Sequence, residues 1–135
     1  MAVKILSEEW VKEFGKAINN NPAYKEAAAW WTGDMLVHVE PSGPLDHDVK
    51  FFLGLHKGEC TGTHIIKEGD NPECEFILAG PYDNFVKVAK GELDTIQGVM
   101  SGKLKLTGNM AKLMRATRAA QEIVNSLQNI DTEFL

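Results

Sequence analysis

Residues 91–115 read GELDTIQGVMSGKLKLTGNMAKLMR, and this stretch decides the fold. Asp94 can cap a short helix, because its carboxylate accepts from backbone N–H groups that have no partner within the helix, and Gly102 can end that helix. Leucine and lysine then alternate over residues 103–107, which predicts a short strand. Asn109 is a suitable cap for the element that follows. The stretch therefore predicts a helix, a strand and the start of another helix.

Further helices are expected on both sides of this stretch. Ser7 can cap a helix that ends at the asparagines before Pro22, and Pro22 suits the first turn of a second helix that runs through Trp30. Gly80-Pro81 opens a third helix, which Gly91 stops. After Asn109 we expect one long final helix, because the apolar residues recur on one face. That face carries Met110, Leu113, Met114, Thr117, Ala120, Val124 and Leu127.

Four segments ahead of residue 80 have the period of two that is typical of half-buried strands. They are Met35–Glu40, Val49–His56, Cys60–Glu68 and Cys74–Ala79. Residues 41–44, 58–59 and 69–72 separate them with glycine, proline and other turn-forming residues, so we expect turns there. A turn at Gly58-Glu59 makes a hairpin of the second and third segments, and the four strands in order predict an antiparallel meander.

Helices, then strands, then helices with one late strand indicate an α+β fold. We predict a five-stranded, mostly antiparallel sheet that is covered on one face by about five helices. The chain has 135 residues and shows no repeat, linker or low-complexity tract, so we expect a single domain over residues 1–135.

The composition limits the partners. A net charge of -5 argues against nucleic acid as a partner and against strong attraction to anionic membranes, although basic residues near the last helix weaken the second point. Cys60 and Cys74 are expected to be free thiols in a reducing compartment, with a single disulfide as the alternative. No long apolar run is present near the N-terminus, so we expect a soluble, cytoplasmic protein.

Residue patterns typical of enzymes are missing. The chain has no phosphate-binding loop, dinucleotide fingerprint or nucleophile elbow, and its histidines (His38, His47, His56 and His64) lack the spacing of metal ligands. We therefore expect no catalytic residue, no metal and no cofactor. With the turn at Gly58-Glu59, His64 falls opposite Leu53 on the core face. We interpret it as a core histidine; the alternatives are a group that meets a ligand head and a catalytic group.

The stretch at residues 91–115 resembles the sterol carrier protein type 2 (SCP-2) sterol-binding domain family. The matching residues are Gly91, Asp94, Met100, Gly102, Lys103, Leu104, Lys105, Leu106, Gly108, Asn109 and Leu113. The expected order of helices and strands before this stretch is also that of the family. The resemblance implies a stand-alone member in which sheet and helices enclose an apolar tunnel for fatty acids, acyl-CoA, sterols or phospholipids.

The resemblance also implies that apolar residues in the C-terminal half of the chain line the tunnel. We expect eight of them to bind the ligand: Phe85, Ile96, Met100, Leu104, Leu106, Met110, Leu113 and Met114. Methionine is unbranched and polarizable, which suits a wall that adapts to varied chains. Taken singly, each residue is equally consistent with an ordinary core position. Four basic residues are candidates for meeting a carboxylate or phosphate head: Lys103, Lys105, Lys112 and Arg115.

The leading functional hypothesis is that the protein binds, and transfers, an apolar lipid. The alternative is an accessory protein that presents a hydrophobic intermediate, such as a quinone precursor, to a partner enzyme. Transient contact with a membrane or a lipid enzyme, and a homodimer through exposed Trp30, Trp31 or Phe52, are left open as further partners. The last residues, Asp131–Leu135, do not match the tripeptide that addresses some relatives to peroxisomes.

Overall fold

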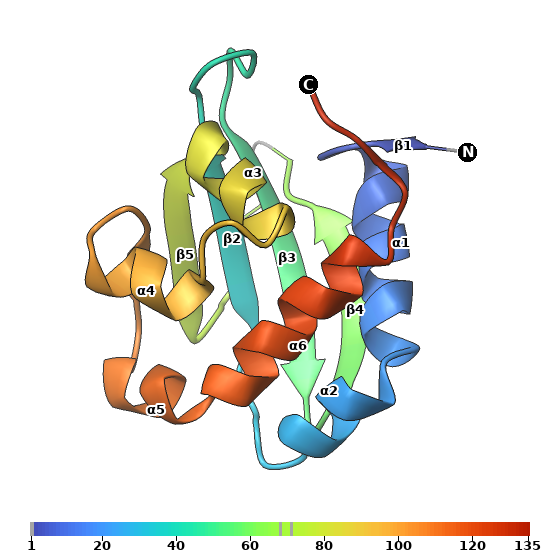
Figure 1. The fold of residues 1–135 in the computed structure, drawn as a ribbon, viewed down its shortest axis with the longest axis vertical. Helices are drawn as coiled ribbons and strands as arrows, with labels where there is room; N and C mark the ends of the chain where they lie inside the picture. The colour runs from blue at the N-terminus through green and yellow to red at the C-terminus, as the bar shows by residue number, and fades with distance from the viewer. Residues whose placement is uncertain (1, 68, 71) are drawn as a thin grey trace.

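The computed structural model describes residues 2–67, 69–70 and 72–135 (Figure 1). Its helices are α1 (Glu8–Asn19), α2 (Pro22–Ala27), α3 (Tyr82–Ala89), α4 (Thr95–Met100), α5 (Met110–Arg115) and α6 (Thr117–Gln128). Its strands are β1 (Val3–Lys4), β2 (Met35–Glu40), β3 (Val49–His56), β4 (Glu59–Ile65), β5 (Phe76–Pro81), β6 (Lys105–Thr107) and β7 (Thr132–Glu133). The predicted strand end at Glu68 and the part of the predicted turn at Asn71 lie outside the described residues.

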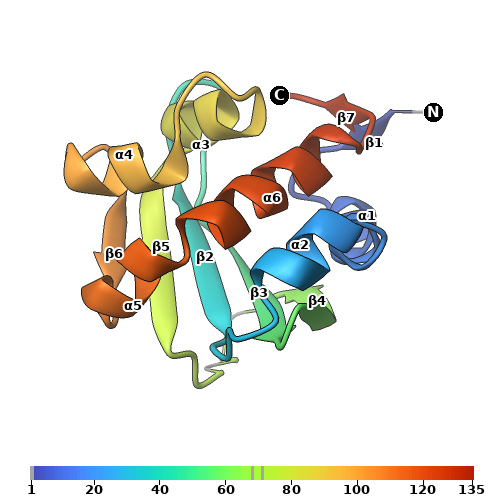
Figure 2. The same cartoon turned by 60° about the horizontal axis from the view of Figure 1, so that its bottom comes forward.

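A five-stranded sheet forms one layer, and the helices cover one of its faces (Figures 1 and 2). This confirms the predicted α+β fold. Alternation along the strands decides which side chains face the helices: Val37 and Val39 of β2 and Phe51 and Leu53 of β3 are all at most 5% exposed. Ile77 of β5 lies in the opposite phase and is 38% exposed. The core therefore lies between the sheet and the helix layer.

The order of the strands is β4-β3-β2-β5-β6, which differs from the predicted meander. Strand β5 does not pair with β4. It pairs with β2, in parallel, from Met35 opposite Phe76 to Glu40 opposite Pro81. The prediction was wrong here because alternation shows which face of a strand is buried but not which neighbour it pairs with. The other three pairs in this sheet are antiparallel.

The turn between β3 and β4 lies one residue earlier than predicted, at Lys57 and Gly58. Both have positive φ, 48° and 82°, which is the combination of a type I′ turn. A register shift next to Gly54 then changes the pairing of the remaining residues. Glycine is well suited to the second turn position because it adopts positive φ without a steric penalty.

This change of register corrects the interpretation of His64. The residue pairs with Phe52, not with Leu53, and so lies on the outer face of the sheet, exposed to solvent. Its ring stacks on that of Phe52, with 5.2 Å between centroids. A slip of one residue moves every side chain of a strand to the other face. His64 is therefore neither a core histidine nor part of a closed polar pocket.

The first two helices begin as predicted. The hydroxyl of Ser7 accepts from the backbone N–H of Trp10 at 3.1 Å, and Asn21 caps α2 through its side-chain oxygen. Helix α2 ends at Ala27, earlier than predicted. Of the aromatic residues expected at a dimer patch, Trp30 is 47% exposed, whereas Trp31 is only 4% exposed and belongs to the core, and Phe52 is half-buried.

The long final helix that the sequence predicts is two helices. Helix α5 ends at Arg115, and α6 starts at Thr117, with the residue between them in a non-helical conformation. The Thr117 hydroxyl donates to the backbone carbonyl of Met114 at 2.9 Å. Threonine side chains compete with the helical hydrogen-bond ladder in this way, which accounts for the break.

A second sheet was not predicted. Strands β1 and β7 pair in parallel, with Val3 opposite Thr132 and Lys4 opposite Glu133. Each strand has two residues, so there is no alternation to detect. The indole N–H of Trp10 donates to the Thr132 hydroxyl at 3.1 Å and ties the C-terminal strand to α1.

Two glycines of the stretch at residues 91–115 allow a matched test. A Cβ at Gly108 would lie 2.6 Å from the Phe76 ring and 2.8 Å from the Glu75 carbonyl oxygen, whereas a Cβ at Gly102 meets nothing within 4 Å. Both residues have positive φ. We expect Gly102→Ala to lower the free energy of unfolding by about 1 kcal/mol through backbone strain alone. We expect Gly108→Ala to lower it by about 2–3 kcal/mol, because a clash with a buried ring adds to the strain. Urea unfolding of both variants measures the difference, and equal losses would contradict the described turn.

The side chain of Tyr24 is completely buried, and its hydroxyl has no hydrogen-bond partner among the described residues. Burial, with a further contribution from the nearby Cys60 thiol, raises the pKa of Tyr24 to about 12. An unpaired buried hydroxyl destabilises the folded state. We therefore expect Tyr24→Phe to raise the free energy of unfolding at pH 7, by about 1 kcal/mol.

The pH dependence gives a second readout for the same variant. In the unfolded chain a tyrosine ionises near pH 10, but in the folded chain Tyr24 stays protonated up to about pH 12. The wild-type protein therefore loses stability as the pH rises from about 10 to 12, and Tyr24→Phe removes this contribution. The advantage of the variant should grow above pH 10. A variant less stable than wild type at pH 7 would show that the hydroxyl is bonded.

Candidate functional site

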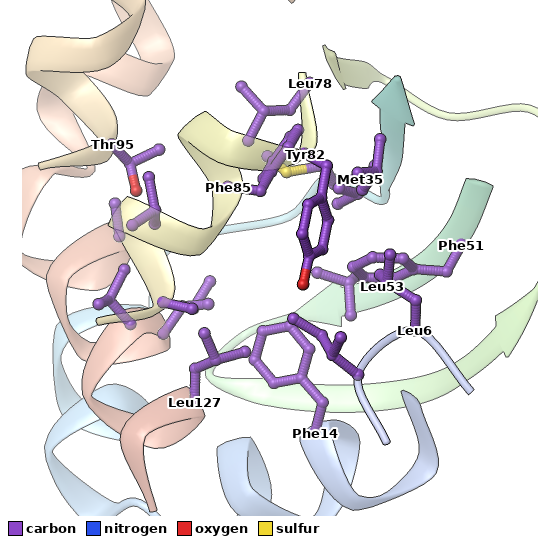
Figure 3. Close-up of a pocket in the computed structure, with 18 of the residues that line it drawn as sticks. Leu6, Phe14, Met35, Phe51, Leu53, Leu78, Tyr82, Phe85, Thr95 and Leu127 are labelled. Carbon is purple, nitrogen blue, oxygen red and sulfur yellow. The ribbon is translucent and has the colours of Figure 1, made fainter. Parts of the chain in front are cut away.

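An apolar cavity of about 120 Å³ lies between the sheet and the helix layer (Figure 3). Its lining comes from α1 and the residues before it at one end, from β2, β3, β5, α3 and α6 in the middle, and from α4, β6 and α5 at the other end. The lining residues are Ile5, Leu6, Trp10, Phe14, Met35, Val37, Val39, Phe51, Leu53, Leu78, Tyr82, Phe85, Val88, Ala89, Thr95, Leu106, Leu113, Ala120, Ile123, Val124 and Leu127.

The sheet forms a rigid floor under this cavity. Residues of β2 and β3 pair directly, with Val37 opposite Phe51 and Val39 opposite Val49. Of these, Val37, Val39 and Phe51 are buried and Val49 is half-buried. Leu78 of β5 extends the floor on the other side of β2. Hydrogen bonding along three paired strands leaves this side of the cavity little freedom to move.

Aromatic rings close the α1 end of the cavity. Trp10, Phe14 and Phe51 contact one another, with centroid distances of 5.5, 5.9 and 6.3 Å, and two of the three pairs meet edge to face. This is a favourable geometry for aromatic pairs. All three residues are at most 5% exposed. The cluster seals this end against solvent.

The roof is less tightly closed. Phe85 of α3 and Ala120, Ile123 and Leu127 of α6 line the cavity and are only half-buried, whereas the sheet residues opposite them are mostly buried. Figure 1 shows α3 and α6 lying side by side over the sheet. Half-buried lining residues therefore occur on this side of the cavity, and also at Leu6, Met35, Thr95 and Leu106.

Few polar atoms reach the wall, and no lining residue carries a charge. Tyr82 is 2% exposed, and its hydroxyl is directed inward in Figure 3. That hydroxyl accepts from the backbone N–H of Leu135 at 3.0 Å and keeps its own hydrogen for donation. Thr95 contributes a second hydroxyl near the α4 end. The site is thus an apolar cavity with two hydroxyl groups at its wall.

Three of the eight residues predicted to bind a ligand line the cavity: Phe85, Leu106 and Leu113. Ile96 and Leu104 are buried, 7% and 2% exposed, but they lie beside the cavity, and Leu104 fills the space next to Gly80 and Gly98. Met100, Met110 and Met114 are 63%, 40% and 40% exposed.

The prediction that these three methionines form the cavity wall is wrong. It assumed one long helix with a continuous apolar face, but α5 has six residues and buries only Leu113. Met100 is the last residue of α4 and points to solvent. The methionine at the wall is Met35 of β2, which the alternation of that strand already places on the inward face.

The four basic residues proposed for a ligand head do not line the cavity. The Lys112 ammonium is bonded to the Glu75 carboxylate at 2.8 and 3.1 Å and to the Thr32 carbonyl, and it lies 4.9 Å from the centroid of the Trp31 ring. Lys112 is therefore occupied by a local network. Lys103, Lys105 and Arg115 are exposed on the surface.

The remaining chemistry-bearing side chains lie outside the cavity. Within the described part of the chain, no group of three or more histidine, cysteine or acidic side chains is arranged to hold a metal ion. Cys60 and Cys74 are free thiols, and burial raises the pKa of both. Among the helices that the structure describes, none is both long and apolar enough to cross a bilayer.

Comparison with known proteins gives a consistent picture. A model of the SCP-2 sterol transfer family matches residues 11–121. A crystal structure of sterol carrier protein 2 is similar with a TM-score of 0.84 and 26% identity, over 93% of this chain and 98% of that one. A conserved hypothetical protein and possible sterol carrier protein from Thermus thermophilus has a TM-score of 0.86 and 26% identity, over 96% and 91% of the two chains.

The ubiquinone synthesis protein UbiJ-SCP2 shares the fold at a TM-score of 0.50 and 15% identity, over 82% of this chain and 84% of that one. A search of curated proteins finds no match.

Proposed function

The chain belongs to the SCP-2 sterol transfer family, and from that membership we propose that it binds an apolar lipid with its hydrocarbon part in the cavity between the sheet and helices α3 and α6. The observation that carries the proposal is the lining itself: 21 residues from both ends of the molecule, none of them charged. Phe85, Leu106 and Leu113 are the ligand-contacting residues that both the sequence and the cavity support.

The energetics suit a carrier that tolerates many ligands. Transfer of each methylene from water is worth about 0.8 kcal/mol, so a 16-carbon chain offers on the order of 10 kcal/mol before the loss of its freedom is counted. Burial of hydrocarbon alone can therefore supply useful affinity. The Tyr82 hydroxyl retains a hydrogen that can be donated to a carboxylate, a sterol hydroxyl or a carbonyl.

Binding of a long chain requires the cavity to widen. An apolar cavity of about 150 Å³ holds benzene, and this one measures about 120 Å³. The floor is a hydrogen-bonded sheet, whereas no backbone hydrogen bond joins α3 to α6 in the part of the chain that the structure describes. We infer that separation of these two helices makes room for the ligand.

A chain-length series tests the proposal. Delipidated protein is titrated with saturated fatty acids of 10 to 16 carbons, and binding is followed by competition with a fluorescent fatty acid and by native mass spectrometry. We expect one lipid per chain, with affinity rising about fourfold for each added methylene. Cholesterol and a prenylated quinone are titrated in parallel. Absence of uptake of every ligand, or affinity that does not depend on chain length, would contradict the proposal.

The same series distinguishes between two roles: transfer of lipid by the isolated protein, and presentation of a hydrophobic intermediate to a partner enzyme. Uptake of the prenylated quinone in preference to fatty acid, together with an enzyme that co-purifies with the protein, would favour the accessory role. Uptake of fatty acids and sterols by the isolated protein would favour a general carrier.

A further inference from the structure

The charge of the molecule is distributed very unevenly along the chain. Residues 95–121 contain five of the 14 lysines and arginines and none of the 19 aspartates and glutamates. The remainder is therefore strongly acidic. These residues form α4, β6, α5 and the start of α6. Figure 2 shows α4 and α5 beside β6, the strand at one edge of the sheet, and α6 running from there across the sheet. The molecule has one basic edge on an otherwise acidic body.

Most of the positive charge at this edge is free. Lys112 is paired with Glu75, as described above. Lys103, Lys105 and Arg115 are exposed, and none of them forms an ion pair with any residue in the described ranges. Arg118 at the start of α6 is also exposed and free of such pairs. A ligand with repeated negative charge can thus meet several cations at once.

Large apolar side chains are exposed at the same edge. Among the described residues, six large hydrophobic side chains are strongly exposed, and four of these are Trp30, Met100, Met110 and Met114. The Arg115 guanidinium lies 5.8 Å from the centroid of the Trp30 ring, so a charged and an exposed apolar side chain are in contact here. We call this surface the basic edge; it comprises Trp30, Lys103, Lys105, Met110, Met114 and Arg115.

We propose that the basic edge docks on an anionic phospholipid membrane. Tryptophan is enriched where protein meets the headgroup layer, flexible methionines can insert among acyl chains, and lysine and arginine near an anionic leaflet attract it. The acidic remainder of the molecule is repelled by the same surface, so the protein approaches with this edge first. The negative net charge of the whole chain does not reveal this local excess of positive charge.

The basic edge shares its elements with the cavity. On β6, the exposed Lys105 is followed by Leu106, which lines the cavity, and on α5 the exposed Met110 and Met114 flank the buried Leu113. Docking therefore places the membrane against the elements that form one end of the cavity wall. The biological role of docking rests on the proposed function, but docking itself does not require that a lipid enter the cavity.

Vesicle sedimentation tests this proposal. Wild-type protein is mixed with vesicles of phosphatidylcholine alone or with vesicles that contain about 30% phosphatidylserine, whose anionic lipid gives a negative surface potential. We expect binding only to the anionic vesicles, weakening as salt is added. Each lysine or arginine near the surface contributes about fivefold in affinity, so Lys103→Glu/Lys105→Glu should weaken binding by about 25-fold or more.

A matched pair of lysines elsewhere provides the control. Lys12 on α1 and Lys87 on α3 are exposed and lie outside the basic edge, so Lys12→Glu/Lys87→Glu makes the same change in net charge. We expect this variant to keep most of the binding. An equal loss in both variants, equal binding to neutral vesicles, or no binding by wild-type protein would overturn the proposal. The last result, together with capture by an acidic protein, would assign the edge to a protein partner.

Tryptophan fluorescence gives an independent readout of orientation. Trp10 and Trp31 are 3% and 4% exposed, so Trp30 is the tryptophan that can meet the membrane. Brominated lipids in anionic vesicles should quench its emission in wild-type protein and not in Trp30→Phe. Uptake of palmitate from cyclodextrin is measured on the same samples. If Lys103→Glu/Lys105→Glu takes up palmitate but does not bind vesicles, the docking surface and the cavity are separate functions; quenching that persists in Trp30→Phe would contradict the orientation.

Discussion

Ala120→Phe is expected to abolish uptake of long-chain lipids while the protein stays folded. Ala120 lines the cavity from α6 and is half-buried, so a larger side chain at this position projects into the space that the ligand needs. Displacement of even four methylenes removes about 3 kcal/mol of burial, which lowers affinity by more than about 100-fold. The added ring enters a cavity that already exists, and cavity-filling substitutions are commonly neutral or stabilising, so we expect little loss of stability.

The neighbouring residue supplies the control for this variant. Gln121 lies on the same helix and is exposed, so Gln121→Phe adds a phenyl ring outside the cavity. We expect Gln121→Phe to bind fatty acids as wild type does. Competition titrations with a fluorescent fatty acid measure both variants, and circular dichroism verifies their folding. Unchanged binding by a folded Ala120→Phe would place the ligand elsewhere.

Phe51→Ala is expected to cause a large loss of stability. Phe51 is 4% exposed, pairs with Val37 across the sheet and contacts the rings of Trp10 and Phe14. Removal of a buried phenyl ring lowers the free energy of unfolding by about 3–5 kcal/mol, because contacts are lost and a void remains. Here the void adds to a cavity that already exists, so the surroundings have few ways to fill it.

The adjacent residue again allows a matched comparison. Phe52 lies on the outer face of the sheet, half-buried against His64. Phe52→Ala removes the same atoms, but water can largely fill the space that they leave on the surface. We therefore expect the free energy of unfolding to fall by only about 1 kcal/mol. Urea unfolding of the two variants measures the difference. A loss at Phe52 equal to that at Phe51 would contradict the assignment of inner and outer faces.

Local features of the fold were predictable from the sequence. Asp94 and Asn109 cap the helices that they were expected to cap, accepting from the backbone N–H groups three residues ahead. These features depend on residues within one turn of each other, so the sequence alone contains the necessary information. Which side chains of β2 and β3 face the helices was also predictable, because alternation along a strand depends only on neighbouring residues.

Features that depend on distant contacts were not predictable. The parallel pairing of β5 with β2 and the pairing of β1 with β7 join segments far apart in the chain. His64 lies on the opposite face from the predicted one because the pairing of β3 with β4 shifts by one residue next to Gly54. Each of these pairings depends on which segments pack against each other in the folded chain. The spacing of apolar residues along the sequence does not contain that information.

The site was predictable in kind but not in detail. The resemblance at residues 91–115 indicated an apolar container, and Leu106 and Leu113 from that stretch do line the cavity. Most of the wall, however, comes from the strands and from α1, α3 and α6. The inward phases of β2 and β3 were a usable signal for Met35 and Phe51. Tyr82 had a signal as well, because Tyr82, Phe85 and Ala89 have the spacing of one helix face and all three line the cavity.

We propose that the cavity beneath α3 and α6 holds the hydrocarbon of the ligand. Methyl-labelled protein with bound 13C-palmitate tests it directly, through nuclear Overhauser contacts between the acyl chain and protein methyl groups. We expect contacts to Val37, Leu106 and Ile123, which line the cavity from three different elements. Contacts confined to the exposed methyl groups of Ile77 and Leu135, or none at all at saturation, would contradict the claim.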